Sequence, residues 1–164
     1  MHPSRRRFAL SLAVLGSLVL GTPSAQAATT CFGRAATIVG TDEVDRIEGT
    51  PGPDVIVGLK GGDRIWGRGG NDRICGGRGN DRIRGGRGRD RIKGGRGVDE
   101  IRGGRGDDLL RGGRRIDLLF GGDGDDSVNG GPGSDELDGG PGGDSLAGKQ
   151  GGDGLFGADG DDTL

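Results

Sequence analysis

Residues 76–84 have the sequence GGRGNDRIR, and this nine-residue skeleton repeats on both sides of them without an insertion or deletion. The frame runs from residue 40 to residue 164 in fourteen copies. Position one is always glycine, position six is always aspartate and position eight is always aliphatic. Position four is glycine except at Glu43 and Arg115. A fixed period of this length indicates a repeat architecture in which each unit stacks on its neighbours.

The invariant positions of the repeat predict its local structure. Glycine at positions one and four, often with another at position two, allows positive φ and close approach of backbones, so we expect the first six residues to form a turn. The aliphatic residue at position eight lies between two outward-facing residues, which is the alternation of a short strand. The last three residues are therefore predicted to form a strand with position eight facing the core. Two repeats then make one full coil.

An aspartate ends every predicted turn, beside carbonyls that the glycines expose. Carboxylate and carbonyl oxygens are the hard ligands that calcium prefers, so the sequence predicts calcium sites at the turns. The aspartates predicted as metal ligands are Asp54, Asp63, Asp72, Asp81, Asp90, Asp99, Asp108, Asp126, Asp135, Asp144, Asp153 and Asp162. Asp45 and Asp117 are left out, because Glu43 and Arg115 replace glycine in their turns.

The frame resembles the hemolysin-type calcium-binding repeat of the RTX family, whose nonapeptide is G-G-x-G-x-D-x-U-x. The resemblance covers residues 40–164. It implies an all-β fold, a right-handed parallel β-roll (a β-solenoid) of about fourteen repeats, with several calcium ions held between turns that lie two repeats apart. By the same resemblance, ions would be shared by Asp72 with Asp90, Asp81 with Asp99, Asp126 with Asp144, Asp135 with Asp153, and Asp144 with Asp162.

Residues 1–27 are predicted to be a cleaved secretory signal peptide. Three arginines at residues 5–7 precede an apolar run over residues 8–20, and Ala25, Gln26 and Ala27 form a small-residue cleavage site. The apolar run is too short for a permanent membrane-spanning helix. The basic start also resembles a twin-arginine export motif, so the general secretory and twin-arginine routes both stay open. Either route predicts a secreted, extracellular protein.

Residues 28–39 are the only mature segment outside the frame, and we expect them to form a short N-terminal cap on the repeat stack. They contain Cys31, and the second cysteine, Cys75, occupies an outward position of a later repeat. Two cysteines in a small secreted domain most often pair, so a Cys31–Cys75 disulfide is predicted. Two free thiols are the alternative.

The composition predicts that folding depends on ions. Only 3% of the residues are aromatic, and the chain contains 42 glycines, so the core is small and the unfolded chain is flexible. Calcium adds binding free energy and neutralises the stacked aspartates. We therefore expect a disordered chain without calcium and a folded roll with it.

The net charge of −2 conceals a strong asymmetry along the chain. Residues 64–115 contain sixteen Lys and Arg against seven Asp and Glu, whereas residues 116–164 contain one lysine against twelve acids. One interpretation is a solvated surface whose cations pair locally with the aspartates. The other is a docking surface for an anionic envelope polymer. Such docking would use ladders of cations on each face of the folded roll, and the residues assigned to them are Arg82, Arg84, Arg91, Lys93 and Arg102.

No catalytic constellation is predicted. The single histidine, His2, lies in the predicted signal peptide, and the chain has no tyrosine. RGG-like strings arise from the repeat itself and do not favour RNA binding. The sequence thus favours a secreted calcium-binding repeat protein that is not an enzyme. The alternatives are a calcium-dependent adhesion protein and a truncated C-terminal module of a larger RTX enzyme or toxin.

Overall fold

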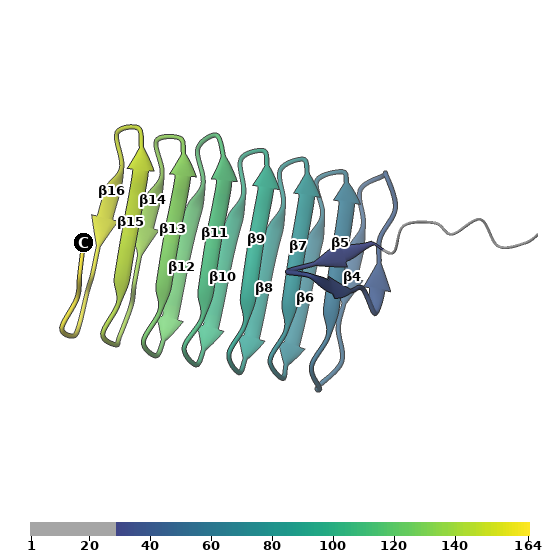
Figure 1. The fold of residues 1–164 in the computed structure, drawn as a ribbon, viewed down its shortest axis with the longest axis horizontal. Helices are drawn as coiled ribbons and strands as arrows, with labels where there is room; N and C mark the ends of the chain where they lie inside the picture. Colours follow the sequence, from purple (N-terminus) through teal and green to yellow (C-terminus); the bar gives the residue numbers. More distant parts are fainter. Residues whose placement is uncertain (1–28) are drawn as a thin grey trace, which may run out of the picture.

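The computed structural model describes residues 29–164, which form a roll of two parallel β-sheets and a small hairpin (Figure 1). The predicted signal peptide, residues 1–27, lies outside the described residues. The odd sheet contains β3 (Ile38–Val39), β5 (Val55–Lys60), β7 (Arg73–Arg78), β9 (Arg91–Arg96), β11 (Leu109–Arg114), β13 (Ser127–Pro132) and β15 (Ser145–Gln150). The even sheet contains β4 (Arg46–Glu48), β6 (Arg64–Gly69), β8 (Arg82–Arg87), β10 (Glu100–Arg105), β12 (Leu118–Asp123), β14 (Glu136–Asp138) and β16 (Gly154–Phe156).

Successive strands alternate between the two sheets, so each strand pairs in parallel with the strand two repeats away. Ile83 of β8, for example, lies in register with Ile65 of β6 and Ile101 of β10. The chain rises through β5, crosses to β6 behind it and returns to β7, which makes the coil right-handed (Figure 1). The predicted β-roll is confirmed, and its seven strands per sheet give seven coils.

The position-eight side chains form one continuous core between the sheets. Twelve of them, from Ile47 to Leu146, are buried in a single cluster. Leu155 and also Ile38, which precedes the predicted repeat region, pack against this cluster. Leu164 does not follow the prediction: it is 64% exposed, because it lies beyond the last bridge of the roll, at Thr163. The inward orientation of position eight is otherwise confirmed.

The predicted division of each repeat into a six-residue turn and a three-residue strand is wrong. Most strands have six residues, and β8 covers positions seven to nine of one repeat and one to three of the next. Only positions four to six remain as the turn. In these six-residue strands the glycine at position one lies inside the strand, and it has no positive φ. Glycine is needed there because a side chain would not fit. A Cβ added to Gly85 would overlap Oδ2 of Asp90 and lie 2.7 Å from the carbonyl oxygen of Gly103.

The segment expected to form the cap has two parts. The antiparallel hairpin of β1 (Thr30–Cys31) and β2 (Arg34–Ala35) lies on the outer face of the odd sheet and contacts β5 and β7 (Figure 1). A disulfide joins Cys31 to Cys75, as predicted, with 5.8 Å between their Cα atoms. β3 follows and becomes the first strand of the odd sheet. Among residues 29–164, no helix has the length and apolar character needed to cross a membrane.

Candidate metal sites

The position-six aspartates form two ladders, one along each edge of the roll where the chain passes between sheets. In both ladders the backbone N–H of one aspartate donates to Oδ1 of the aspartate 18 residues later. This hydrogen bond is 2.8 Å from Asp72 to Asp90 and 2.9 Å from Asp81 to Asp99. The same bond joins Asp126 to Asp144, Asp135 to Asp153 and Asp144 to Asp162. The structure therefore brings together all five aspartate pairs that were expected to share ions.

The second carboxylate oxygen, Oδ2, is buried without a hydrogen-bond partner in ten of these aspartates. They are Asp63, Asp72, Asp81, Asp90, Asp99, Asp108, Asp117, Asp126, Asp135 and Asp144. A buried polar atom without a partner destabilises a fold by roughly 1 to 3 kcal/mol, and by more when it is charged. Each of these oxygens can accept a proton or a cation, and either would remove this penalty.

Burial also changes the acidity of these carboxyl groups. Desolvation raises the pKa of Asp90 to about 7, against the opposing effect of the hydrogen bond from Asp72, and the charge of Asp72 raises it further. Desolvation likewise raises the pKa of Asp108 to about 8. The pKa is raised to about 6 for Asp72 and Asp99, and to about 7 for Asp81, Asp117 and Asp126. Ionised carboxylates in the ladders are therefore unfavourable unless a cation neutralises them.

The residue at position two decides whether Oδ2 has a partner. In all ten turns with an unpartnered Oδ2, here termed open turns, position two has a positive φ, even where it is Leu59 or Arg68. The turns of Asp45 and Asp54, here termed closed turns, have threonine there without a positive φ. Thr50 donates its backbone N–H and its hydroxyl to Oδ2 of Asp54, at 2.6 and 2.9 Å. Thr41 makes the same two bonds to Asp45.

Comparison with known families identifies the repeat. A family model described as the RTX calcium-binding nonapeptide repeat matches residues 39–74, 48–83, 76–110, 103–137, 111–146 and 138–164. The chain belongs to this RTX family. The matched segments cover both ladders and the whole core, and the repeats of this family bind calcium. No curated protein sequence shows significant similarity to the chain.

The donor set of the RTX turns fits calcium. Among residues 29–164, no group of three or more His, Cys, Asp or Glu side chains gathers to hold a metal, so any ion there also needs backbone carbonyls. The turns supply them, since successive coils approach so closely that a Cβ added to Gly97 would overlap the carbonyl oxygen of Gly79. Calcium takes six to eight oxygen ligands, including carboxylates and carbonyls. Zinc prefers nitrogen and sulfur ligands, which these turns lack.

Two aspartates differ from what their sequence context suggested. Asp117 was left out because Arg115 replaces a glycine, but its turn has the open geometry: Oδ1 accepts from Asp99 at 2.9 Å and Oδ2 is unpartnered. Arg115 adopts the positive φ that glycine would have adopted. Asp54 was included, but it lies in a closed turn. Glycine at positions one and two, as in Gly112 and Gly113, was the signal for an open turn at Asp117.

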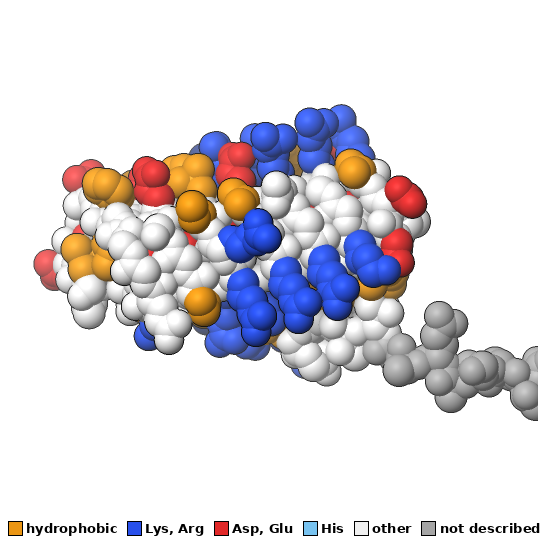
Figure 2. Space-filling model, turned by 90° about the horizontal axis from the view of Figure 1, so that it is seen from above, with side chains coloured by type: hydrophobic (Ala, Val, Ile, Leu, Met, Phe, Trp, Pro, Cys, Tyr) orange, Lys and Arg blue, Asp and Glu red, His pale blue; other side chains and the backbone are white. Residues whose placement is uncertain are grey.

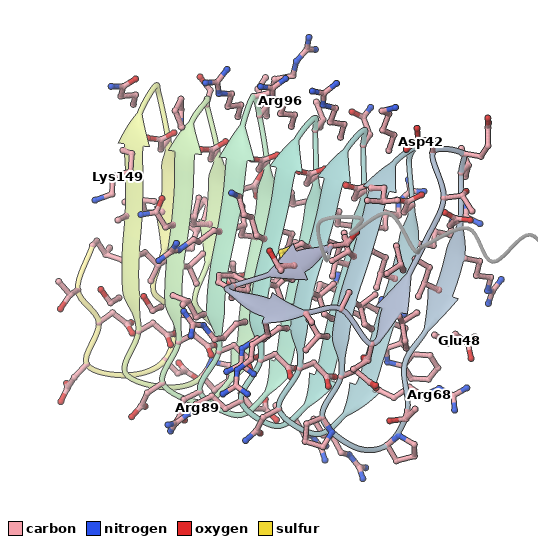
Figure 3. The ribbon with its side chains drawn as sticks, turned by 45° about the vertical axis from the view of Figure 1, so that its right-hand side comes forward. Asp42, Glu48, Arg68, Arg89, Arg96 and Lys149 are labelled. Atoms are coloured by element: carbon pink, nitrogen blue, oxygen red, sulfur yellow. A yellow bond between two sulfur atoms is a disulfide. The ribbon has the colours of Figure 1, made fainter. Side chains whose placement is uncertain are left out.

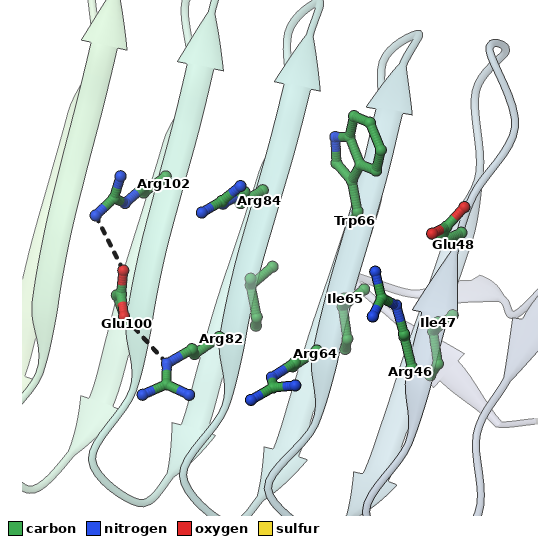
Figure 4. A pocket seen from close by; sticks show the side chains of 11 residues that line it. Arg46, Ile47, Glu48, Arg64, Ile65, Trp66, Arg82, Arg84, Glu100 and Arg102 are labelled. Carbon is green, nitrogen blue, oxygen red and sulfur yellow. Dashed lines mark hydrogen bonds and ion pairs between the residues drawn. The ribbon is translucent and has the colours of Figure 1, made fainter.

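The five cations expected to form ladders on each face of the roll lie on both sheets. Arg82, Arg84 and Arg102 line a trough of about 500 Å³ on the even sheet, beside Trp66 (Figure 4). The remaining two lie on the odd sheet. Arg91 stacks on Phe32 of the hairpin at 4.8 Å, and Lys93 lines a separate groove.

Local pairing accounts for few of the surface cations. Of the sixteen Lys and Arg in residues 64–115, five form ion pairs with acidic side chains: Arg68, Arg82, Arg89, Arg102 and Arg105. The pair of Arg68 with Glu48 lies at the N-terminal end of the roll (Figure 3). No ladder aspartate takes part in these pairs, because their carboxylates point into the roll. For these sixteen cations, the expected local pairing with aspartates is confirmed only for Arg89 with Asp107 and Arg105 with Asp123, neither of which is a ladder aspartate.

Proposed function

We propose that the protein is a secreted calcium-binding module whose folding is driven by calcium held at the open turns. The observation that carries this proposal is the set of ten buried, unpartnered Oδ2 atoms in a chain of RTX repeats. Rolls of calcium-binding repeats are typically non-catalytic, which supports a binding function over an enzymatic one.

The proposed ligands are the aspartates of the open turns together with carbonyls of the adjacent turns. Neighbours in one ladder, such as Asp72 and Asp90, would share an ion, and Asp117 joins the set. Asp153 and Asp162 are included as the last acceptors of the two ladders. Asp54 is placed outside it, because Thr50 already satisfies its Oδ2. A bound calcium ion supplies the positive charge that offsets the buried carboxylates. Since it binds the folded chain only, it shifts the equilibrium toward the roll.

Secretion is part of the proposal. The sequence of residues 1–27 has the pattern of a signal peptide, and proteins with RTX repeats are usually secreted. The Cys31–Cys75 disulfide also suits an oxidising compartment. Extracellular calcium modules bind the ion at roughly 0.1 to 1 mM, so the roll would fold only after export.

Circular dichroism during a calcium titration tests the proposal. We expect little β structure in chelator and a cooperative gain of β structure at roughly 0.1 to 1 mM calcium. Magnesium should substitute poorly, because it demands stricter octahedral geometry and dehydrates reluctantly. A spectrum that stays unchanged from chelator to saturating calcium would overturn calcium-driven folding.

A second candidate function is the binding of an anionic polymer by the folded roll. It is favoured by the eleven cations of residues 64–115 that have no acidic partner within the described chain. The uneven distribution of charge supports it as well, since the basic side chains gather toward the N-terminal half of the roll (Figure 2).

A further inference from the structure

A row of cations follows the edge at which the odd strands end (Figure 2). The row consists of the last residues of β5, β7, β9 and β11, at position three of their repeats, and adjacent members lie in register: Lys60, Arg78, Arg96 and Arg114. Strands in a sheet are about 4.8 Å apart, so the edge row presents one positive charge per strand at about this interval. Like charges directly opposite each other are destabilising. The free roll would therefore gain stability from an anion on this edge.

A groove of about 640 Å³ runs beside the edge row on the odd sheet. Lys93 lines the groove together with the row, and Cys75 of the disulfide lines it further down the sheet. The single acidic side chain among its lining residues is Asp42, which pairs with Lys60 at one end. Arg78, Arg96 and Arg114 have no acidic partner in the part of the chain that the structure describes.

Other cation rows on the roll are partly neutralised. In the trough on the even sheet, Glu100 pairs with Arg82 at 3.3 Å and with Arg102 at 3.0 Å (Figure 4). At the opposite edge, Arg105 of β10 pairs with Asp123 of β12. The edge row, with four members, is the longest run of cations in register on the two described sheets, and only Lys60 in it has an acidic partner.

The backbone beneath the edge row is held by hydrogen bonds between coils. The carbonyl of Arg96 accepts from the N–H of Gly79 at 2.8 Å, and the carbonyl of Arg114 accepts from Gly97 at 3.3 Å. The side chain of Arg96 points away from the roll at this edge (Figure 3). Because the backbone is already ordered, a ligand has to order only the exposed ends of the side chains, which reduces the entropy lost on binding.

We propose that the groove and its edge row bind a linear acidic polysaccharide whose chain lies along the axis of the roll. This inference rests on the proposed function, because only the folded roll aligns the cations. Guanidinium groups bind carboxylate and sulfate in bidentate geometry. A polysaccharide with one anion on each sugar repeats its charge at an interval similar to the strand spacing. Nucleic acid fits less well, since the groove has no aromatic lining residue on which bases could stack.

Two matched triple variants test the inference in saturating calcium. The edge variant carries Arg78→Ser, Arg96→Ser and Arg114→Ser. The trough variant carries Arg46→Ser, Arg64→Ser and Arg84→Ser, three arginines without an ion pair that line the trough. Both variants lose the same charge. Chondroitin sulfate is the probe, because it carries on average one anion per sugar and does not gel with calcium. Hyaluronate, with one anion per two sugars, is the control polymer, and a DNA duplex is the competing class.

Isothermal titration calorimetry should show tighter binding of chondroitin sulfate than of hyaluronate of equal length. The edge variant should lose about tenfold in affinity, which corresponds to about 1.4 kcal/mol, or about 0.5 kcal/mol for each of the three charge contacts that are removed. The trough variant should stay within about twofold of the wild type. Equal losses in the two variants would overturn the inference, and so would tighter binding of DNA that depends on the edge row.

Circular dichroism of each protein separates this inference from the proposed function. If the wild type folds in calcium but binds no chondroitin sulfate, the groove is not a polysaccharide site and calcium-driven folding stands. If calcium produces no roll, the proposed function itself fails. Should the edge variant not fold, the three Arg→Lys changes at the same positions keep the charge and remove the bidentate geometry. That variant should lose affinity for chondroitin sulfate by a smaller factor, and unchanged affinity would contradict the inference.

Discussion

The closed turns of Asp45 and Asp54 differ from the open turns that follow in how the aspartate Oδ2 is satisfied. In a closed turn, threonine at position two supplies a backbone N–H and a hydroxyl to that oxygen. In an open turn, position two has a positive φ and the oxygen is buried without a partner. One residue per repeat therefore determines whether the chain completes its own turn or leaves an oxygen for a proton or a cation.

The comparison indicates that the N-terminal coil and the inner coils of the roll depend on calcium to different degrees. The two closed turns lie at the N-terminal end, where the turns need no ion to satisfy their carboxylates. The turns from Asp63 to Asp144 each add a buried carboxylate whose Oδ2 has no partner and whose pKa is raised. We therefore expect the N-terminal coil to retain structure more easily than the inner coils when calcium is removed.

The largest expected effect is that of pH on the stability of the roll in the absence of calcium. The folded pKa of the inner aspartates is raised to about 6 to 8, against about 3.9 in an unfolded chain. The folded state then binds more protons than the unfolded state, so stability is fully present below about pH 4 and is lost as pH rises through about 6 to 8. Circular dichroism in chelator should show more β structure at pH 5 than at pH 8, where we expect little.

Saturating calcium should reverse this dependence, because protons then compete with the ion for the same oxygens. A chelated protein that is more stable at pH 8 than at pH 5 would show that the open carboxylates are not buried in the way described.

The next effect concerns single aspartates in the two kinds of turn. Asp90→Ala removes an open-turn carboxylate and leaves the backbone N–H of Asp72 without its acceptor, a loss of about 1 to 3 kcal/mol in addition to the lost ion ligand. Asp45→Ala should shift the calcium midpoint less, because Asp45 is half-buried and accepts from the neighbouring Thr41. Calcium titrations of the two variants measure the difference.

Asp90→Asn is the matched control that separates the loss of the ion ligand from the loss of the hydrogen bond. It keeps an acceptor for the N–H of Asp72 and removes the charge, so it should fold in chelator at least as well as the wild type and still need more calcium to reach full structure. Equal midpoints for Asp90→Ala and Asp45→Ala would remove the distinction between open and closed turns.

A smaller effect is expected on stability when glycine at position four is replaced, and it should differ between open and closed turns. Gly88, in the open turn of Asp90, has φ of +118°, and an added Cβ would overlap the carbonyl oxygen of Gly70. Gly52, in the closed turn of Asp54, has no such φ, and its nearest atom would be Oγ1 of Thr50 at 3.8 Å. Gly88→Ala should destabilise the calcium-loaded roll by about 1 to 3 kcal/mol, whereas Gly52→Ala should change it by at most about 0.5 kcal/mol. Thermal unfolding of both variants in calcium tests this, and similar losses would contradict it.

The smallest expected effect is a gain in the stability of the calcium-loaded roll. Arg115 is exposed and has φ of +83° at a position where nearly every other repeat has glycine. Because a side chain disfavours this conformation by roughly 1 kcal/mol, Arg115→Gly should raise the unfolding free energy in calcium by up to about that amount. Lys149→Gly, at φ of +85°, should behave in the same way. A loss of stability in either variant would show that the arginine or lysine side chain makes a compensating contact.

The sequence was sufficient to predict the roll, because a fixed period makes every coil repeat the same local choices. The aliphatic residue at position eight predicted the core, and the aspartate at position six predicted the ladders. Ile38 was missed because Ala36 stands where an aspartate would have extended the frame. The length of the strands was missed because pairing at positions one to three depends on the neighbouring coil and not on the residues themselves.

The candidate sites were less predictable from single residues. Arg115 suggested a defective turn, but a strained backbone leaves the Asp117 turn open all the same. Asp54 was predicted to be a ligand, although the hydroxyl of Thr50 closes its turn. Both outcomes depend on φ at one residue, which tertiary hydrogen bonds set in the folded roll.

Anomalous diffraction from crystals grown in calcium would test the difference between open and closed turns most directly. We predict ions between successive open turns of each ladder, including the turn of Asp117, with Oδ2 of the aspartates among their ligands. We predict none that is held by Oδ2 of Asp45 or Asp54. Ions coordinated equally by the threonine-closed turns, or no ions along the ladders at saturating calcium, would contradict the proposal that position two determines where calcium binds.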